Sequence, residues 1–201
     1  MISNETSKNF SLFILLIAFI AFMYGTVKAI QIVSKTQIST NDGIYTSYVT
    51  TSNEIHQKAK LLIDKCNNDT CKIQSLLDYV TNIPYYTNTF QQKSPQKIIQ
   101  ENYGDCDDKS NLLISMLRAV GIEAYFVLVP KHIFVIVPLE NKHFKNKKGL
   151  WINGRKYYIL ESTAKNSKIG FPLHYKLVDI DTVIEPFMNK MIQINTLSYK
   201  L

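Results

Sequence analysis

One cysteine stands at the start of the clearest helical pattern in the chain. Cys106 precedes apolar residues that recur at helical spacing over 112–120, and Gly121 follows as a stop signal. A thiol at a helix N-terminus feels the positive end of the helix dipole, which favours the nucleophilic thiolate. The spacing also puts Cys106 on the same face as Leu113 and Leu117, which must pack on the domain. Cys106 is therefore a candidate nucleophile, and the alternative is a small buried apolar residue.

His132 is the candidate base for this nucleophile. It begins an apolar run over 133–137, and strand alternation puts it on one face with Phe134 and Ile136. An imidazole at the end of a buried strand could take the proton of a thiol held in the crevice between helix and sheet. The alternative is a core histidine that bonds to a backbone carbonyl.

Glu161 could complete the set as a third member. It ends the apolar strand pattern over 157–160, and it could hold the far nitrogen of His132 and stabilise the imidazolium. The alternative is a carboxylate at a solvated strand end. Together the three residues predict acyl transfer through a thioester, with the backbone N–H of Cys106 as one oxyanion donor and Tyr103 as a weak candidate for the second.

No metal or cofactor is expected. Asp105 and Asp107 hint at a calcium loop, but Ser110 and Met116 stand where such a loop needs glycine and glutamate. Asp108 is instead expected to cap the helix or to anchor a neighbouring loop. Three histidines show no zinc-ligand spacing with the cysteines: His56, His143 and His174.

The N-terminal region reads as a membrane anchor. No charged residue occurs over 9–27, which is close to the roughly 20 residues that a helix needs to cross a bilayer. The alternative is a cleaved signal peptide, for which Val27-Lys28-Ala29 would serve as the cleavage site. Lysines on the two sides of the segment nearly balance, so the charge pattern does not fix the orientation.

Cys66 and Cys71 flank a polar turn over 67–70 and could form a disulfide across it. The alternative is two free cysteines in a reducing compartment. A disulfide would favour an extracytoplasmic position of the main domain, which we take as the prediction for a single-pass membrane protein.

The order of the patterns predicts an α+β domain with an antiparallel sheet, because helices come first and strands follow. We divide the chain into a tail and transmembrane helix over 1–33, a polar stalk over 34–51 and one domain over 52–201. Helices are expected near 53–66, 70–83, 95–102 and 105–120, and strands near 124–129, 133–139, 151–152 and 156–160. Thr70 is expected to cap the second helix, and Asn153-Gly154 to form a two-residue hairpin turn between the last two strands. Residues 183–191 fit either a strand or a helix.

The segment over 103–110 reads Tyr-Gly-Asp-Cys-Asp-Asp-Lys-Ser, and Leu-Arg-Ala-Val-Gly-Ile follows over 117–122. Together with the strand that starts at His132 and the strand end over 158–163, it resembles the transglutaminase-like superfamily. The likeness covers about 52–170. It implies a papain-like core of microbial type, in which a nucleophile helix packs on an antiparallel sheet and Cys106, His132 and Glu161 form the triad.

Two departures bear on what the resemblance implies. Glu161 and Ser162 replace the commoner aspartate and proline, and the short stretch between Cys106 and His132 leaves little room for the insertions of animal transglutaminases. The closer match is therefore a membrane-anchored cysteine peptidase or amidase with a protein or peptide substrate, for example a cell-wall peptide. The alternatives are a true protein-crosslinking transglutaminase and a binding module with little or no catalytic activity.

The charge of the chain allows anionic partners. The formal net charge is +7, while 46% hydrophobic residues exclude bulk disorder, so most basic residues are expected on a solvated surface. Four lysines gather in one stretch: Lys142, Lys145, Lys147 and Lys148. Only one aromatic residue, Phe144, lies among them and no nucleic-acid-binding motif is present, so no nucleic-acid partner is expected.

Overall fold

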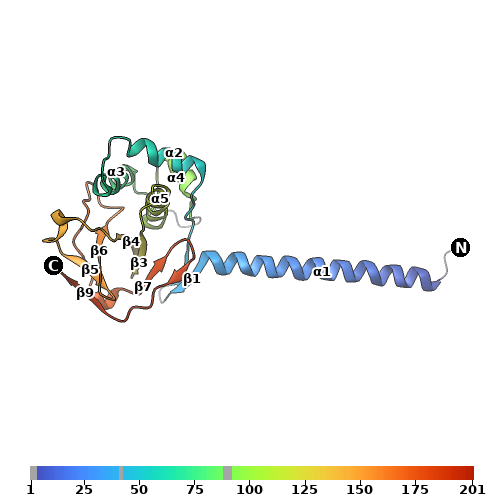
Figure 1. Ribbon diagram of the computed structural model, residues 1–201. Coiled ribbons are helices and arrows are strands. Elements are labelled where there is room, and N and C mark those ends of the chain that lie inside the picture. Colours follow the sequence, from blue (N-terminus) through green and yellow to red (C-terminus); the bar gives the residue numbers. More distant parts are fainter. Residues whose placement is uncertain (1–3, 41–42, 88–91) are drawn as a thin grey trace. The chain divides into compact units, whose positions relative to one another are not determined.

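The computed structural model describes residues 4–40, 43–87 and 92–201, which fall into two units that meet between Gln37 and Ile38. The first unit is a single helix, α1 (Asn4–Thr36) (Figure 1). Its stretch Asn9–Ile30 has a mean hydropathy of 2.4, and none of the searched window is buried against other parts of the chain. A helix of this length and composition can cross a membrane.

The polar segment expected as a stalk is partly built into the second unit, so this prediction needs a correction. The segment contains two short paired strands, β1 (Gln37–Thr40) and β2 (Gly43–Thr46). Tyr45 is buried in the core with its ring centroid 5.3 Å from that of Phe126. The backbone N–H of Tyr48 donates to Asn111 Oδ1, which also binds this segment to the domain. Burial of Tyr45 thus holds part of this polar segment against the core.

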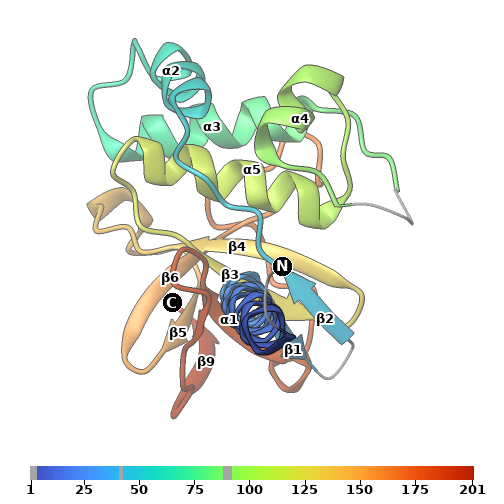
Figure 2. The same ribbon diagram turned by 90° about the vertical axis from the view of Figure 1, so that its right-hand side faces the viewer.

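Four helices cover one side of the sheet in the second unit (Figure 2): α2 (Asn53–Leu62), α3 (Asp69–Asn82), α4 (Pro95–Glu101) and α5 (Cys106–Ala119). Each begins where a polar side chain accepts a hydrogen bond from the first turn, as an N-cap does. These caps are Ser52, Asn68, Ser94 and Asp105. Asn68 takes the place expected for Thr70, so α3 starts slightly earlier than the sequence pattern indicates.

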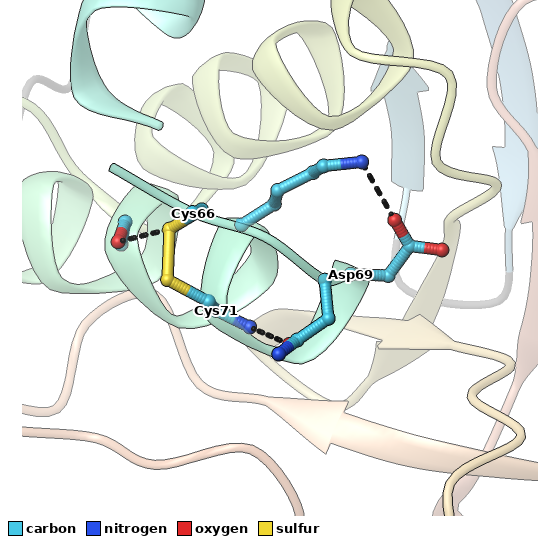
Figure 3. Close-up of a disulfide and its surroundings, with 6 residues drawn as sticks. Cys66, Asp69 and Cys71 are labelled. Atoms are coloured by element: carbon cyan, nitrogen blue, oxygen red, sulfur yellow. Dashed lines mark hydrogen bonds and ion pairs between the residues drawn. A yellow bond between two sulfur atoms is a disulfide. The ribbon is translucent and has the colours of Figure 1, made fainter. Parts of the chain in front are cut away.

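A disulfide joins Cys66 to Cys71 across the turn that links α2 to α3 (Figure 3). Asn68 Oδ1 accepts from the N–H of Cys71, and Lys72 pairs with Asp69 at 2.9 Å, so the same turn also holds the helix cap. The pairing expected as one of two possibilities is therefore present.

Seven antiparallel strands form the main sheet, in the order β8-β7-β3-β4-β6-β5-β9. They are β3 (Tyr125–Val129), β4 (His132–Val137), β5 (Gly149–Ile152), β6 (Arg155–Leu160), β7 (Thr182–Glu185), β8 (Lys190–Met191) and β9 (Leu197–Lys200). Two short 3₁₀ helices lie between strands, over Lys142–Phe144 and Leu177–Asp179. The α+β class and the antiparallel sheet are as predicted, and the strand alternative for 183–191 is the correct one.

The hairpin between β5 and β6 turns at Asn153 and Gly154, whose φ values are 49° and 83°. Two residues with positive φ make the turn that Asn-Gly favours, so this prediction is confirmed. Helix α5 lies between the other helices and the sheet and contacts β4, which explains why it is buried along most of its length. Its position sets the place of Cys106.

Candidate active site

Cys106 is the first residue of α5, and the cap residue Asp105 accepts from the N–H of Asp108 at 3.1 Å. The cysteine is half-buried and packs against the helix-side core cluster, which contains Leu113 and Leu117. This is the face predicted from the helical spacing. The thiol donates a hydrogen bond to Asp107 Oδ1 at 3.5 Å.

The thiol is held in its neutral form. Burial raises the pKa of Cys106 to about 12, and the neighbouring carboxylates of Asp107 and Asp105 add to the rise. The expectation that the helix N-terminus favours a thiolate is therefore outweighed, because desolvation and two like charges act on the same sulfur. Attack by this sulfur therefore requires a base that takes the proton.

His132 and Glu161 lie at matching ends of two paired strands. His132 begins β4, Glu161 directly follows β6, and these strands run antiparallel with Val135 opposite Leu160. His132 Nε2 lies 2.9 Å from Glu161 Oε2. Both side chains are mostly buried, at 16% and 10% exposure, so the contact is shielded from water.

Thr163 fixes the second oxygen of the acid. Its backbone N–H and its hydroxyl both donate to Glu161 Oε1, at 3.0 and 2.6 Å. Burial works to raise the pKa of Glu161, but the hydrogen bonds from His132 and Thr163 outweigh it and hold the pKa below its usual value. The carboxylate is thus charged and oriented, and the side chain, longer than aspartate, still reaches His132. Sequence reasoning did not single out Thr163.

A serine pair connects the segment after β6, which carries Glu161, to helix α5, which carries Cys106. Ser110 Oγ on α5 lies 3.0 Å from Ser162 Oγ, and both side chains are buried. Ser162 stands where the family pattern usually has proline, so the departure seen in the sequence brings a polar contact between the elements that carry Cys106 and Glu161.

Tyr175 covers the histidine from the segment after β6. Its ring is stacked on that of His132, with centroids 6.0 Å apart and planes 18° apart, and it also stacks on Phe134 at 6.4 Å. Burial raises the pKa of Tyr175, and the charge of Glu161 raises it further. No pattern in the sequence pointed to this residue.

The acidic neighbours of Cys106 anchor the segment that precedes α4. Asp108 Oδ1 accepts from the N–H of Lys93 at 2.7 Å, and Asp107 Oδ2 accepts from Gln92 Nε2 at 3.0 Å. Asp108 is 1% exposed, and burial raises its pKa to about 6. The prediction that Asp108 anchors a neighbouring loop is confirmed.

Lys109 binds a second segment of the chain, the one that follows α3. This lysine is fully buried on α5, and its Nζ donates to the carbonyl of Ile83 at 2.8 Å. Burial lowers its pKa to about 8, while Glu161 opposes the shift. Gly104 forms a β-bridge with Tyr85, so the chain after α3 runs alongside the approach to Cys106.

The predicted site residues are thus only partly connected. The structure joins His132 to Glu161, whereas the thiol of Cys106 bonds to Asp107, and no hydrogen bond links Cys106 to His132 within the described residues.

The ring of Tyr103 contacts Lys93 and Tyr86. Across 4–40, 43–87 and 92–201, no group of three or more His, Cys, Asp or Glu side chains is arranged to hold a metal ion.

The arrangement of a helix-borne cysteine, a strand-borne histidine and an acid on the next strand agrees with a sequence comparison. The profile of the transglutaminase-like superfamily matches residues 56–161, just over half of the chain, and the match includes all three residues. The chain belongs to the transglutaminase-like superfamily. No curated protein matches it.

Solved structures similar to this superfamily member share little sequence with it. A candidate protease from Parabacteroides distasonis is 18% identical, with a TM-score of 0.45 over 70% of this chain and 27% of its own. A candidate cysteine protease from Cytophaga hutchinsonii is 17% identical, with a TM-score of 0.45 over 77% and 52%. LapG from Legionella pneumophila is 15% identical, with a TM-score of 0.44 over 61% and 77%. The chain thus spans 27% of the length of the first of these proteins and 52% of the second.

Proposed function

We propose that this transglutaminase-like protein is a membrane-anchored cysteine peptidase or amidase that uses Cys106, His132 and Glu161. The observation that carries the proposal is the contact of His132 Nε2 with Glu161 Oε2 at 2.9 Å, with Thr163 holding the other oxygen. A charged, oriented acid behind a histidine has the geometry of the third member of a triad.

The contact with Glu161 supports one tautomer of His132. With Nε2–H donating to the ionised Glu161, Nδ1 keeps the lone pair and acts as the base. Nδ1 takes the proton of Cys106 as the sulfur attacks the amide carbonyl carbon, and it then gives that proton to the leaving amine. Water next attacks the thioester, its proton passes through His132, and the acid is released with the thiol restored.

Because the pKa of Cys106 is raised, the thiolate forms only as the attack takes place. With a pKa of about 12 the resting site holds a neutral thiol, so proton transfer to His132 accompanies attack. The backbone N–H of Cys106 is placed at the helix N-terminus, where an oxyanion would be stabilised.

Two features of the rest of the chain support a location for the reaction. The apolar stretch Asn9–Ile30 supports a single membrane anchor, and the disulfide between Cys66 and Cys71 supports an extracytoplasmic domain, since such bonds persist in oxidising compartments. The expected substrate is a protein or peptide near the membrane surface, with a cell-wall peptide as one candidate.

Alkylation of the thiol tests the triad without a known substrate. Cys106 is the free cysteine of the chain, so iodoacetamide labels one site in the full-length protein in detergent micelles. We expect His132→Ala to slow the labelling near neutral pH by about tenfold or more, and the control His56→Ala to leave the rate unchanged. Equal rates in the wild type and His132→Ala would overturn the proposal in favour of a binding module.

The acyl acceptor is tested separately. A mixture of peptides is incubated with the protein and a fluorescent primary amine, and the products are analysed by mass spectrometry. We expect new carboxyl ends or deamidated glutamine that depend on Cys106, because water is the acceptor. Covalent incorporation of the amine as the main product would instead show a crosslinking transglutaminase.

A further inference from the structure

A cavity separate from the candidate active site lies at the far ends of β4 and β6, the strands that carry the catalytic pair. It has a volume of about 590 Å³, and we call it the lysine–tryptophan pocket. Its lining includes three apolar or aromatic side chains, those of Leu139, Trp151 and Tyr158. It also includes three lysines: Lys142, Lys145 and Lys156. The proposed mechanism uses none of these residues.

The fold brings two further aromatic residues to the lysine-rich stretch, whose own sequence contains only Phe144. Lys156 Nζ lies 5.2 Å from the ring centroid of Tyr158 and 5.8 Å from that of Trp151. The same ammonium donates to the carbonyl of Lys147 at 2.8 Å, so it is fixed in place. Lys200, on β9, stands 5.6 Å above the ring of Trp151. The β5–β6 hairpin thus places the rings of Trp151 and Tyr158 among lysine side chains.

The lysines of the pocket outnumber its carboxylates. Lys142 and Lys145 are exposed, and the described lining also includes Glu140 and Leu201, the last residue of the sequence, which carries a terminal carboxylate. Lysine ammonium groups around an apolar floor attract a ligand that combines carboxylates with apolar side chains. An acidic peptide has this composition.

We propose that the lysine–tryptophan pocket binds an acidic segment of the peptide substrate. A nucleic acid fits less well, because Lys156 and Lys200 already occupy positions over the ring of Trp151 on which a base would stack. A bilayer surface fits less well, because the aromatic floor lies in a hollow. The assignment to the substrate rests on the proposed peptidase function, whereas binding of an acidic peptide does not.

The pocket and the catalytic pair lie at opposite ends of the same two strands. Tyr158 precedes Glu161 by three residues along β6, which corresponds to about 10 Å, and Leu139 follows His132 by seven residues, which corresponds to about 23 Å. The strand residues between them are buried, so a substrate that reaches both sites would pass over the surface and span more than these distances.

The only tryptophan of the chain is Trp151, so its fluorescence reports directly on this pocket. The probe is a glutamate-rich hexapeptide without tryptophan or tyrosine, titrated into full-length Cys106→Ser protein in detergent micelles. We expect a saturable change in Trp151 emission, absent with the glutamine counterpart of the peptide and weakened by added salt. The double variant Lys142→Gln/Lys145→Gln should raise the Kd by about five- to thirtyfold.

A matched pair of substitutions separates the pocket from general charge. Lys65→Gln/Lys165→Gln removes the same charge from exposed lysines outside the pocket and should leave the Kd within about twofold. Equal weakening by both pairs, or no saturable change with the acidic peptide, would overturn the proposal. Tighter binding of a single-stranded oligonucleotide or of phosphatidylserine vesicles would overturn the assignment to a peptide.

Failure of this site and failure of the catalytic proposal are distinguishable. Cys106→Ser cannot form a thioester, so peptide binding is measured without turnover. Circular dichroism of each variant shows whether it is folded. A folded Lys142→Gln/Lys145→Gln variant that alkylates at the wild-type rate, yet loses peptide binding, would support the pocket as a site separate from the chemistry.

Discussion

Glu161 contacts His132 with one carboxylate oxygen and Thr163 with the other, so both oxygens of the acid are committed. A carboxylate held at two points cannot rotate away from the imidazole, and the imidazole in turn keeps a fixed ring orientation. The family-typical aspartate is one carbon shorter. The presence of glutamate here is therefore compatible with a working triad, because its longer side chain still places Oε2 at 2.9 Å from His132 Nε2.

Replacing the acid by its amide tests this arrangement. Glu161→Gln keeps the shape but removes the charge that stabilises the imidazolium, so alkylation of Cys106 near neutral pH should slow by about tenfold to a hundredfold. Glu161→Asp keeps the charge on a shorter side chain, so its alkylation rate should lie between those of the wild type and Glu161→Gln. Rates are measured by mass spectrometry after timed exposure to iodoacetamide. A Glu161→Gln protein that labels as fast as the wild type would contradict the role of the acid.

Tyr175 should act as a positioning residue through its ring. Tyr175→Phe keeps the stack on His132, whereas Tyr175→Ala removes it and lets water reach the His132–Glu161 contact. We expect Tyr175→Phe to retain the wild-type pH profile of Cys106 alkylation, and Tyr175→Ala to shift that profile and to lower the rate by about threefold to thirtyfold. Identical profiles for all three proteins would show that the ring has no influence on the histidine.

The contact between Ser110 and Ser162 should couple α5 to the strand end that carries Glu161. Each alanine substitution leaves the other hydroxyl buried without this partner, so each single variant should lose about 1 to 2 kcal/mol of unfolding free energy. The double variant should lose less than the sum, with a coupling of about 1 kcal/mol. Urea denaturation followed by circular dichroism measures all four proteins. Strictly additive losses would show that the two hydroxyls do not interact.

The disulfide between Cys66 and Cys71 should contribute modestly to stability because it closes a short loop. The chain-entropy relation gives about 2 kcal/mol for a loop of this size. Cys66→Ser/Cys71→Ser should lower the unfolding free energy by that amount and leave alkylation of Cys106 unchanged, since the bridge lies at the turn between α2 and α3. A protein isolated from membranes with both thiols free would contradict an extracytoplasmic domain.

Much of the fold was accessible from the sequence because its signals are local. Helical spacing in α5 and the Asn153–Gly154 turn depend on neighbouring residues, and both were predicted in type and near their observed bounds. The stalk was wrong in part because burial of Tyr45 depends on Phe126, far along the chain. No local pattern reports a contact of that kind.

The candidate site divides in the same way. Cys106, His132 and Glu161 were found because each begins or ends a periodic element, and the family motif sets their order. Tyr175 and Thr163 were missed because they lie in irregular segments, where residue type alone does not indicate which side chain they contact. The neutral state of the Cys106 thiol was missed because the helix dipole is visible in the sequence, whereas the degree of burial is not.

Asp108 should make stability depend on pH in the acidic range. Its pKa is raised to about 6, first by burial and then by Asp105, against the N–H of Lys93. One oxygen, Oδ2, is buried without a hydrogen-bond partner in the described chain, which fits a carboxyl that keeps its proton. The folded protein therefore binds this proton more tightly than the unfolded chain, whose aspartate titrates near 4.

The sign of the effect follows from this difference. Between about pH 4 and pH 6 the folded state holds more protons, so raising the pH through this window lowers the unfolding free energy, by up to about 1.4 kcal/mol per pH unit from this group. Asp108→Asn keeps an acceptor for the N–H of Lys93 and cannot ionise, so its stability should fall less steeply than that of the wild type over the same window. The exposed Asp64→Asn is the matched control and should keep the wild-type slope. Urea unfolding at pH 4, 5 and 6 measures the three slopes, and equal slopes for Asp108→Asn and the wild type would contradict the assignment.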